Sequence, residues 1–201
     1  MSREFEAEAE RIKLSRVLGV PVSELTALQT VPAAQLHELR QQTSALFYED
    51  GRRLFENLAK ASRLLPVSAL ASMATRVFGP MFAARITGFL PAERAAAVAE
   101  RLDPPFMAEL SAHLDPRRVD ALLARLPAQT IVSVAGVLHR ERQFITMAMF
   151  VDSIPLPVIS QVVDAIDDAE ALLRIAFFVE DAGQLEAVIA HLDDSHMAAV
   201  V

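Results

Sequence analysis

The chain has 201 residues, is 53% hydrophobic and carries a net charge of −7, with no Cys and no Trp. Its length suffices for one large domain or two small ones with a packed core. Its apolar content excludes a disordered chain, and the lack of Cys excludes a disulfide scaffold, a thiolate zinc site and a cysteine nucleophile. The 34 Ala and 25 Leu residues predict an all-α protein, because both are strong helix formers.

The charge is unevenly distributed along the chain. Residues 1–142 have a net charge of +2, whereas residues 143–201 carry only Arg174 against 10 acidic residues, a net charge of −9. This acidic balance predicts no binding to nucleic acid. The N-terminal residues alternate acids and bases, unlike a signal peptide, and we expect a cytoplasmic protein, with which the lack of Cys agrees.

Residues 1–65 predict a helical cap without internal repetition. Residues 3–17 are typical of a helix that ends at Gly19, and a short helix follows Ser23, a suitable N-cap. Apolar residues then follow the spacing of one long helix from about residue 32 to residue 65, with Gly51 in its middle as a candidate break. Such a helix can cap the open end of a helical repeat or pair with a second copy of the chain.

The most apolar stretch, residues 64–90, predicts two buried helices and no membrane span. Arg76 and Arg85 interrupt this stretch, and Gly79-Pro80 breaks it. The apolar pieces that remain are well short of the ~20 residues needed to cross a bilayer.

From residue 78 onward the chain shows a 12-residue period. Each unit closes on a large apolar residue and usually reopens with Asp or Pro, which suit the first positions of a helix. The closing residues are Phe78, Leu90, Leu102, Leu114, Leu126 and Leu138, and the period continues with small insertions to Val151, Ile166, Val179 and Leu192. We expect Leu102, Leu114 and Leu126 to be buried. The last unit, from Asp193, is shorter than a full period, so the repeat is either truncated or ends within a unit.

A second pattern, with twice that period, indicates that two successive units form one helix pair. Eight residues before successive closing positions, apolar or neutral residues alternate with arginine: Phe82, Arg94, Phe106, Arg118 and Thr130. One helix of each pair is therefore expected to be more exposed than the other. Short helices that contact only their neighbours are typical of an α-solenoid.

The sequence pattern of these units resembles that of a known family. The string LPAERAAAVAERLDPPFMAELSAHLDPRRVDALLARLPAQTIVSVAGVL is similar to the intracellular N-terminal domain of MgtE-type magnesium transporters, and the resemblance extends over about residues 79–201. That domain is a right-handed superhelix of short helices, related in shape to flagellar motor switch proteins and armadillo-like repeats. The resemblance implies a right-handed solenoid over residues 66–201, after a helical cap over residues 1–65. It implies neither transport nor a particular magnesium ligand, because it covers no membrane bundle and no matched site motif.

Acidic residues at the repeat starts are the first candidate site. Stacked helices would bring several carboxylates to one edge, where magnesium needs only one or two of them directly. The alternative is ordinary capping of helix starts, where acids are favoured without a metal. The metal candidates are Asp164, Asp167, Asp168 and Asp181.

Arginines seven positions apart, repeated one helix pair later, are the second candidate site. We expect Arg94, Arg101, Arg118 and Arg125 to form a ridge that binds an acidic partner, such as the acidic end of another copy. The alternative is a solvated face on which Glu93, Glu100 and Asp120 are local partners.

The sequence contains no Gly-rich phosphate loop and no nucleophile elbow. We therefore expect a non-catalytic module for protein interaction or regulation, which binds a protein partner or a second copy and holds no cofactor. The alternative is a regulatory domain that senses magnesium.

Overall fold

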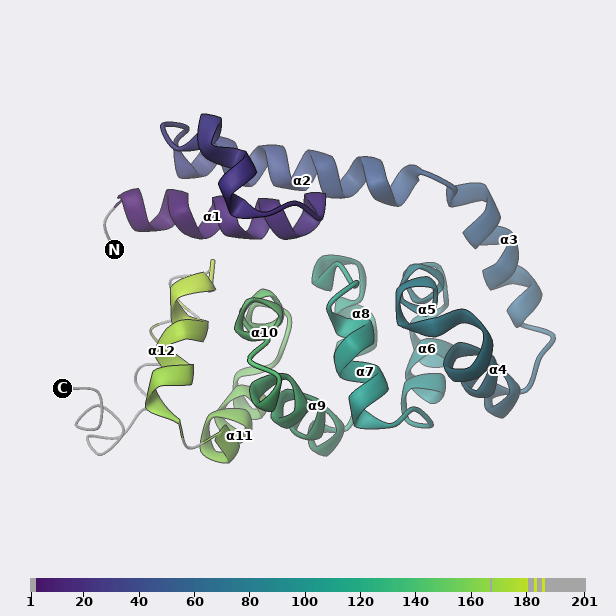
Figure 1. Ribbon diagram of the computed structural model, residues 1–201. Coiled ribbons are helices and arrows are strands. Elements are labelled where there is room, and N and C mark those ends of the chain that lie inside the picture. The colour runs from purple at the N-terminus through teal and green to yellow at the C-terminus, as the bar shows by residue number, and fades with distance from the viewer. Residues whose placement is uncertain (1–2, 167, 181–182, 184–185, 187–201) are drawn as a thin grey trace. The chain divides into compact units, whose positions relative to one another are not determined.

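The computed structural model describes residues 3–166, 168–180, 183 and 186. In this part of the chain all regular structure is helical and there is no strand, which confirms the all-α prediction. The elements in chain order (Figure 1) are α1 (Arg3–Leu18), the 3₁₀-helix η1 (Val22–Leu28), α2 (Ala33–Glu49), α3 (Arg52–Ser62), α4 (Val67–Met73), the π-helical turn η2 (Ala74–Phe78), α5 (Gly79–Thr87), α6 (Ala92–Ala99), α7 (Pro104–Ser111), the 3₁₀ turn η3 (Pro116–Arg118), α8 (Asp120–Leu123), α9 (Ala128–Arg140), α10 (Phe144–Val151), α11 (Leu156–Ile166) and α12 (Ala169–Phe178).

The chain forms two compact units, residues 1–52 and 53–201. This division lies earlier than the expected boundary between residues 65 and 66. The predicted long helix is two helices, α2 and α3, because Gly51 between them has φ +73°, a left-handed conformation that favours glycine. Almost all of α3 therefore lies within the second unit.

The first unit is a pair of helices joined by η1. Helices α1 and α2 pack against each other, and Leu14 and Leu36 have no exposed surface. Helix α1 ends before Gly19, which has φ +69°, as the sequence predicts. The short helix begins at Val22, so the expected N-cap at Ser23 is wrong: Pro21 precedes the helix and no side chain caps it.

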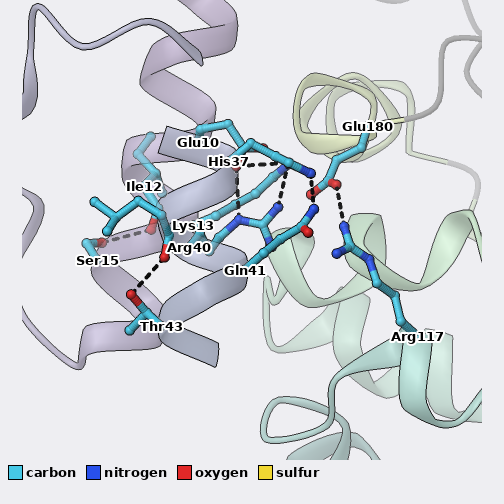
Figure 2. Close-up of polar contacts among 11 residues, drawn as sticks. Glu10, Ile12, Lys13, Ser15, His37, Arg40, Gln41, Thr43, Arg117 and Glu180 are labelled. Carbon is cyan, nitrogen blue, oxygen red and sulfur yellow. Dashed lines mark hydrogen bonds and ion pairs between the residues drawn. The ribbon is translucent and has the colours of Figure 1, made fainter. Parts of the chain in front are cut away.

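A buried carboxylate in the first unit holds α1 against α2. Glu10 accepts from Lys13 Nζ at 2.9 Å and from Arg40 Nε at 2.9 Å, and His37 Nδ1 lies 3.5 Å from it (Figure 2). Glu10, Lys13 and Arg40 are all buried. A paired and hydrogen-bonded charge of this kind fixes the register of two helices, because removal of either partner leaves a buried charge without compensation.

The second unit consists of short helices that pack on the next but one along the chain. The main pairs of this kind are α4 with α6, α5 with α7, α6 with α8, α7 with α9, α9 with α11, and α10 with α12, while α9 also packs on its direct neighbour α10 and α11 contacts α12. Helices of four to thirteen residues are marginal alone. Each is therefore held by neighbours two positions away.

Aspartates open these helices as the repeat predicts. Asp103 Oδ1 accepts from Phe106 N at 2.8 Å, Asp115 Oδ1 from Arg117 N at 3.2 Å, and Asp168 Oδ1 from Ala171 N at 3.0 Å. The prolines that follow, Pro104 and Pro116, are the first residues of their helices. Capping thus accounts for the regular return of Asp in the sequence.

In the first repeats, the buried core residues stand about one helical turn before the residues that close each 12-residue unit. Leu102, Leu114 and Leu126 were expected to be buried, but they are half-buried at the edges of two apolar clusters. They lie in the turns that follow α6, α7 and α8, where one side of each residue faces solvent. The buried residues stand within or at the start of the helices, among them Leu110, Val119, Leu122 and Leu123. The later closing residues, Leu138, Val151, Ile166 and Val179, are buried.

The apolar stretch from α4 to α5 is broken in its middle. Residues Val67–Thr87 are long and apolar enough to cross a membrane by length and composition, and 28% of the most apolar window is buried. Gly79 has φ +73° and ψ 171°, a conformation that essentially only glycine adopts. The stretch is therefore two helices, of which α4 packs on α6 and α5 on α7.

Candidate functional site

The second unit contains a cavity of about 110 Å³ between its later helices. Side chains from α7 to α12 and from the turns between them line it, including Met107, Leu126, Val134, Met147, Val163 and Ile175. The helices that contribute are spread over a long stretch of sequence, and the packing of alternate helices brings them together. The cavity is thus a product of the tertiary structure and not of one motif.

The lining is apolar apart from one hydroxyl group. Ser111 Oγ donates to the carbonyl oxygen of Met107 at 2.7 Å, so that hydroxyl already has a partner. None of the lining side chains is titratable. Such a lining can exclude water from an apolar group. The free energy gained is roughly 25 cal/mol for each Å² of apolar surface that is buried.

The sequence around this cavity is acidic. Residues 104–180, which form α7 to α12 and the turns between them, hold ten acidic residues against six cations. The one cation after residue 142, Arg174, bonds to Glu170 one helical turn away. Asp152, Asp164 and Glu170 are exposed. At the end of α12, beside the cavity residue Val179, Glu180 accepts from Arg117 of η3 at 3.3 Å (Figure 2).

The metal candidates are only partly within the described residues. Asp164 is exposed on α11, and Asp168 is the N-cap of α12, whereas Asp167 and Asp181 lie outside the residues that the structure describes. Within that described part, neither Asp164 nor Asp168 belongs to a group of three converging carboxylate or imidazole ligands. The capping alternative therefore accounts for Asp168.

Asp168 has a second contact, with His139 at the end of α9. Its Oδ2 lies 3.2 Å from His139 Nε2. The backbone hydrogen bond from Ala171, followed by the hydrogen bond with His139, holds the pKa of this carboxyl below its ordinary value. The charged form of Asp168 is thus favoured in the folded chain.

The four arginines of the expected ridge have different environments. Arg94 donates to the carbonyl oxygens of Ser62 and Leu65, at the turn between α3 and α4. Helix α6 ends at Ala99, so Arg101 lies in the turn beyond it and not, as expected, on the same helix as Arg94. Arg101 is exposed.

The other two arginines have acidic partners nearby. Arg118 Nε lies 3.4 Å from Asp115 of the preceding turn. Arg125 Nη2 donates to Glu93 of α6 at 2.8 Å, and the local partner Glu93 was foreseen as the alternative to a ridge. The pKa of Glu93 is lowered, first by a backbone hydrogen bond and then by Arg125.

Two features were missed in the sequence. One is the cavity, for which residues 144–151 (FITMAMFV) carried a signal: a helix with a single polar side chain, here Thr146, is buried. The other is an aromatic cluster in which Phe55 of α3 lies 5.1 Å from Phe82 and 6.1 Å from Phe89, measured between ring centroids. The guanidinium of Arg85 covers the Phe55 ring at 4.6 Å.

Comparison with protein-family models, with curated proteins and with solved structures finds no significant match to this chain. The resemblance to the MgtE N-terminal domain therefore stays a prediction from the sequence.

Proposed function

We propose that this protein is a non-catalytic helical-repeat module that binds an apolar segment of a protein partner. The observation that carries the proposal is the apolar cavity bounded by α7 to α12. Because its lining offers no titratable group, it suits recognition by burial of apolar side chains.

The arrangement of the helices supports a solenoid as the architecture of this module. The 12-residue period predicts short helices, and the packing of each helix on the next but one is what a stack of helix pairs requires. Solenoids present extended surfaces on which a partner segment can lie along several repeats.

The charge around the cavity defines the partner further. Residues 104–180 hold ten acidic residues against six cations, so the partner segment that fits best combines apolar residues with Lys or Arg. An amphipathic helix with a basic polar face has this chemistry.

The test is calorimetric titration of the full chain with an amphipathic helical peptide made of Leu and Lys. We expect saturable binding, with no binding of a peptide of equal charge in which Ser replaces Leu. Ala176→Trp fills the cavity from α12, and Val162→Phe fills it from α11, where both parent residues are half-buried in the lining. Either change is expected to weaken binding by at least about tenfold.

The matched control is Ala165→Trp, an exposed position on α11 outside the lining. Its affinity for the Leu/Lys peptide should equal that of the parent chain. Equal affinity of the parent, A176W and V162F chains would contradict the cavity as the binding site, and no binding at all by the parent would contradict the proposal itself.

The alternative, a magnesium-sensing domain, rests on the acidic repeat starts. Asp164 and Asp168 are the candidates within the described residues, and Asp168 already contacts Ala171 N and His139. Magnesium would have to raise the melting temperature more than sodium chloride of equal ionic strength does, since equal effects are simple screening.

A further inference from the structure

We propose that the α3–α5 end of the second unit binds the surface of an anionic membrane and lies on that surface without crossing it. The proposal rests on three properties of residues 54–85: exposed aliphatic side chains, an excess of cations, and an apolar stretch that is only partly buried.

The exposed aliphatic side chains of the second unit concentrate in this segment. Leu64, in the turn between α3 and α4, is 88% exposed, Val77 of η2 is 70% exposed and Met81 of α5 is 62% exposed. Leu54 and Leu65 are exposed as well. Isolated exposed apolar residues are ordinary, but five of the seven large apolar residues that are exposed in the described part of the second unit fall within residues 54–81.

The same segment carries cations and almost no acid. Residues 54–85 contain one acid, Glu56, and hold Lys60, Arg63, Arg76 and Arg85. Arg85 is used inside the fold, where it covers the ring of Phe55. Lys60, Arg63 and Arg76 are exposed, and no described residue forms an ion pair with them. Each Lys or Arg near an anionic bilayer strengthens binding by about fivefold, equivalent to ~1 kcal/mol.

The third property is the low burial of the apolar stretch. The core helix of a water-soluble protein that is apolar enough to span a membrane is mostly buried, whereas only 28% of the apolar window within Val67–Thr87 is buried. Its exposed apolar side chains are Val77 and Met81, and its other apolar side chains are buried or half-buried. A bilayer interface suits the two exposed ones, because it accepts aliphatic side chains to a depth of about 5–10 Å.

The geometry favours a segment that lies on the membrane over one that spans it. Gly79, with φ +73° and ψ 171°, separates α4 and η2 from α5, and each piece is well below the ~20 residues that a span needs. Helices α4 and α5 are also fixed to α6 and α7 within the second unit. Long Lys and Arg side chains at such a surface can reach the headgroups while their methylene groups stay in the apolar layer.

A bilayer fits this surface better than an acidic protein does. Protein interfaces are enriched in exposed aromatic residues, but Phe55 is buried here, and the half-buried Phe82 and Phe89 lie against its ring. What remains outside is Leu, Val and Met together with Lys and Arg.

The test is co-sedimentation of the full chain with vesicles. One set contains phosphatidylcholine alone and the other equal parts of phosphatidylcholine and phosphatidylglycerol. We expect binding to the second set only, and weaker binding as salt is raised, because salt screens the attraction.

Two variants separate the charged and the apolar contributions. The triple change Lys60→Gln, Arg63→Gln and Arg76→Gln should weaken binding on the order of a hundredfold, from three cations at about fivefold each. The triple change Leu64→Ser, Val77→Ser and Met81→Ser should also abolish most binding, while circular dichroism stays that of the parent because these side chains are exposed.

The matched control is Arg101→Gln, Arg117→Gln and Arg174→Gln, three exposed cations of the same unit outside this segment. It should bind the anionic vesicles as the parent does. Equal loss in the control and in the Lys60/Arg63/Arg76 variant would overturn the proposal, since the attraction would then be unspecific. A second outcome would also overturn the proposal. In it, the parent chain binds neither set of vesicles but self-associates in sedimentation, and the Lys60/Arg63/Arg76 variant does not self-associate. A second copy of the chain would then be the partner of this surface.

Discussion

At residue 168 a single carboxylate begins helix α12 and also contacts the end of α9. One oxygen accepts from Ala171 N at 3.0 Å, and the other lies 3.2 Å from His139 Nε2. Helix N-caps contribute about 1 kcal/mol each. The stability of α12 against α9 therefore depends on this one side chain more than on its neighbours in the acidic sequence.

Asp168→Ala is predicted to lower the free energy of unfolding by about 1 kcal/mol, because the cap is lost. Asp168→Asn keeps an oxygen acceptor for Ala171 N and should cost less. The pKa of Asp168 is lowered in the folded chain, so its charge stabilises the fold above the ordinary aspartate pKa of about 3.9, and this contribution is lost as the pH falls through the lower, folded-state pKa. Urea unfolding at neutral pH and below pH 4 checks this: the difference between parent and D168N should narrow in acid. A constant difference at both pH values would contradict it.

Arg94 and Arg101 have similar sequence contexts but different contacts. Arg94 donates to the carbonyl oxygens of Ser62 and Leu65 and so closes the turn that follows α3. Arg94→Ala is predicted to cost about 2 kcal/mol, because two carbonyl groups lose a charged donor. Arg101→Ala, at an exposed position, should change stability by no more than about 0.5 kcal/mol. Chemical denaturation of both variants measures the contrast, and equal effects would show that the Arg94 contacts contribute nothing.

At the scale of elements, the ring of Phe55 joins α3 to α5 and to the turn that follows α5. Phe55 is buried and lies against Phe82 and the guanidinium of Arg85, both of α5, and against Phe89 just after that helix. An amphipathic helix of 11 residues is held by its packing and not by its own propensity. The position of α3 therefore depends on this ring.

Phe55→Ala is predicted to destabilise the second unit by about 3–5 kcal/mol, the usual cost of a large cavity in a core. Hydrogen exchange should show loss of protection in α3 before α9 or α10. Phe55→Leu keeps most of the apolar volume and is the control, with a smaller loss. If α3 stayed protected in the F55A chain, other contacts would hold it.

At the scale of the whole molecule, the chain divides close to Gly51 into two units. The three apolar clusters of the core all lie within residues 53–201. We predict that a fragment of residues 53–201 folds on its own with a cooperative thermal transition and a helical circular dichroism spectrum, because its core needs no residue of the first unit. A fragment that melts without cooperativity would contradict this division.

The sequence alone determined the fold class, the short helices of the second unit and the aspartates that cap three of them. Asp103, Asp115 and Asp168 were predicted to open helices and do so, because capping is a local hydrogen bond between residues two or three positions apart. Gly19 and Gly51 likewise follow the ends of helices at positions that the sequence predicts. Both have a left-handed conformation, which glycine adopts without a steric penalty because it has no Cβ.

Only the tertiary structure decided which side chains are buried and which charged side chains have a partner. The repeat marks Leu114 as strongly as any core residue, yet Leu114 is half-buried while Leu122 is buried, because burial depends on the helix two positions away. The same holds for the candidate sites. Arg94 donates to the turn after α3 and Arg125 donates to Glu93. The cavity between α7 and α12 exists only once those helices are packed. Periodicity and caps are local and can be read from neighbouring residues, whereas partners far apart in the sequence are chosen by packing, which no local pattern records.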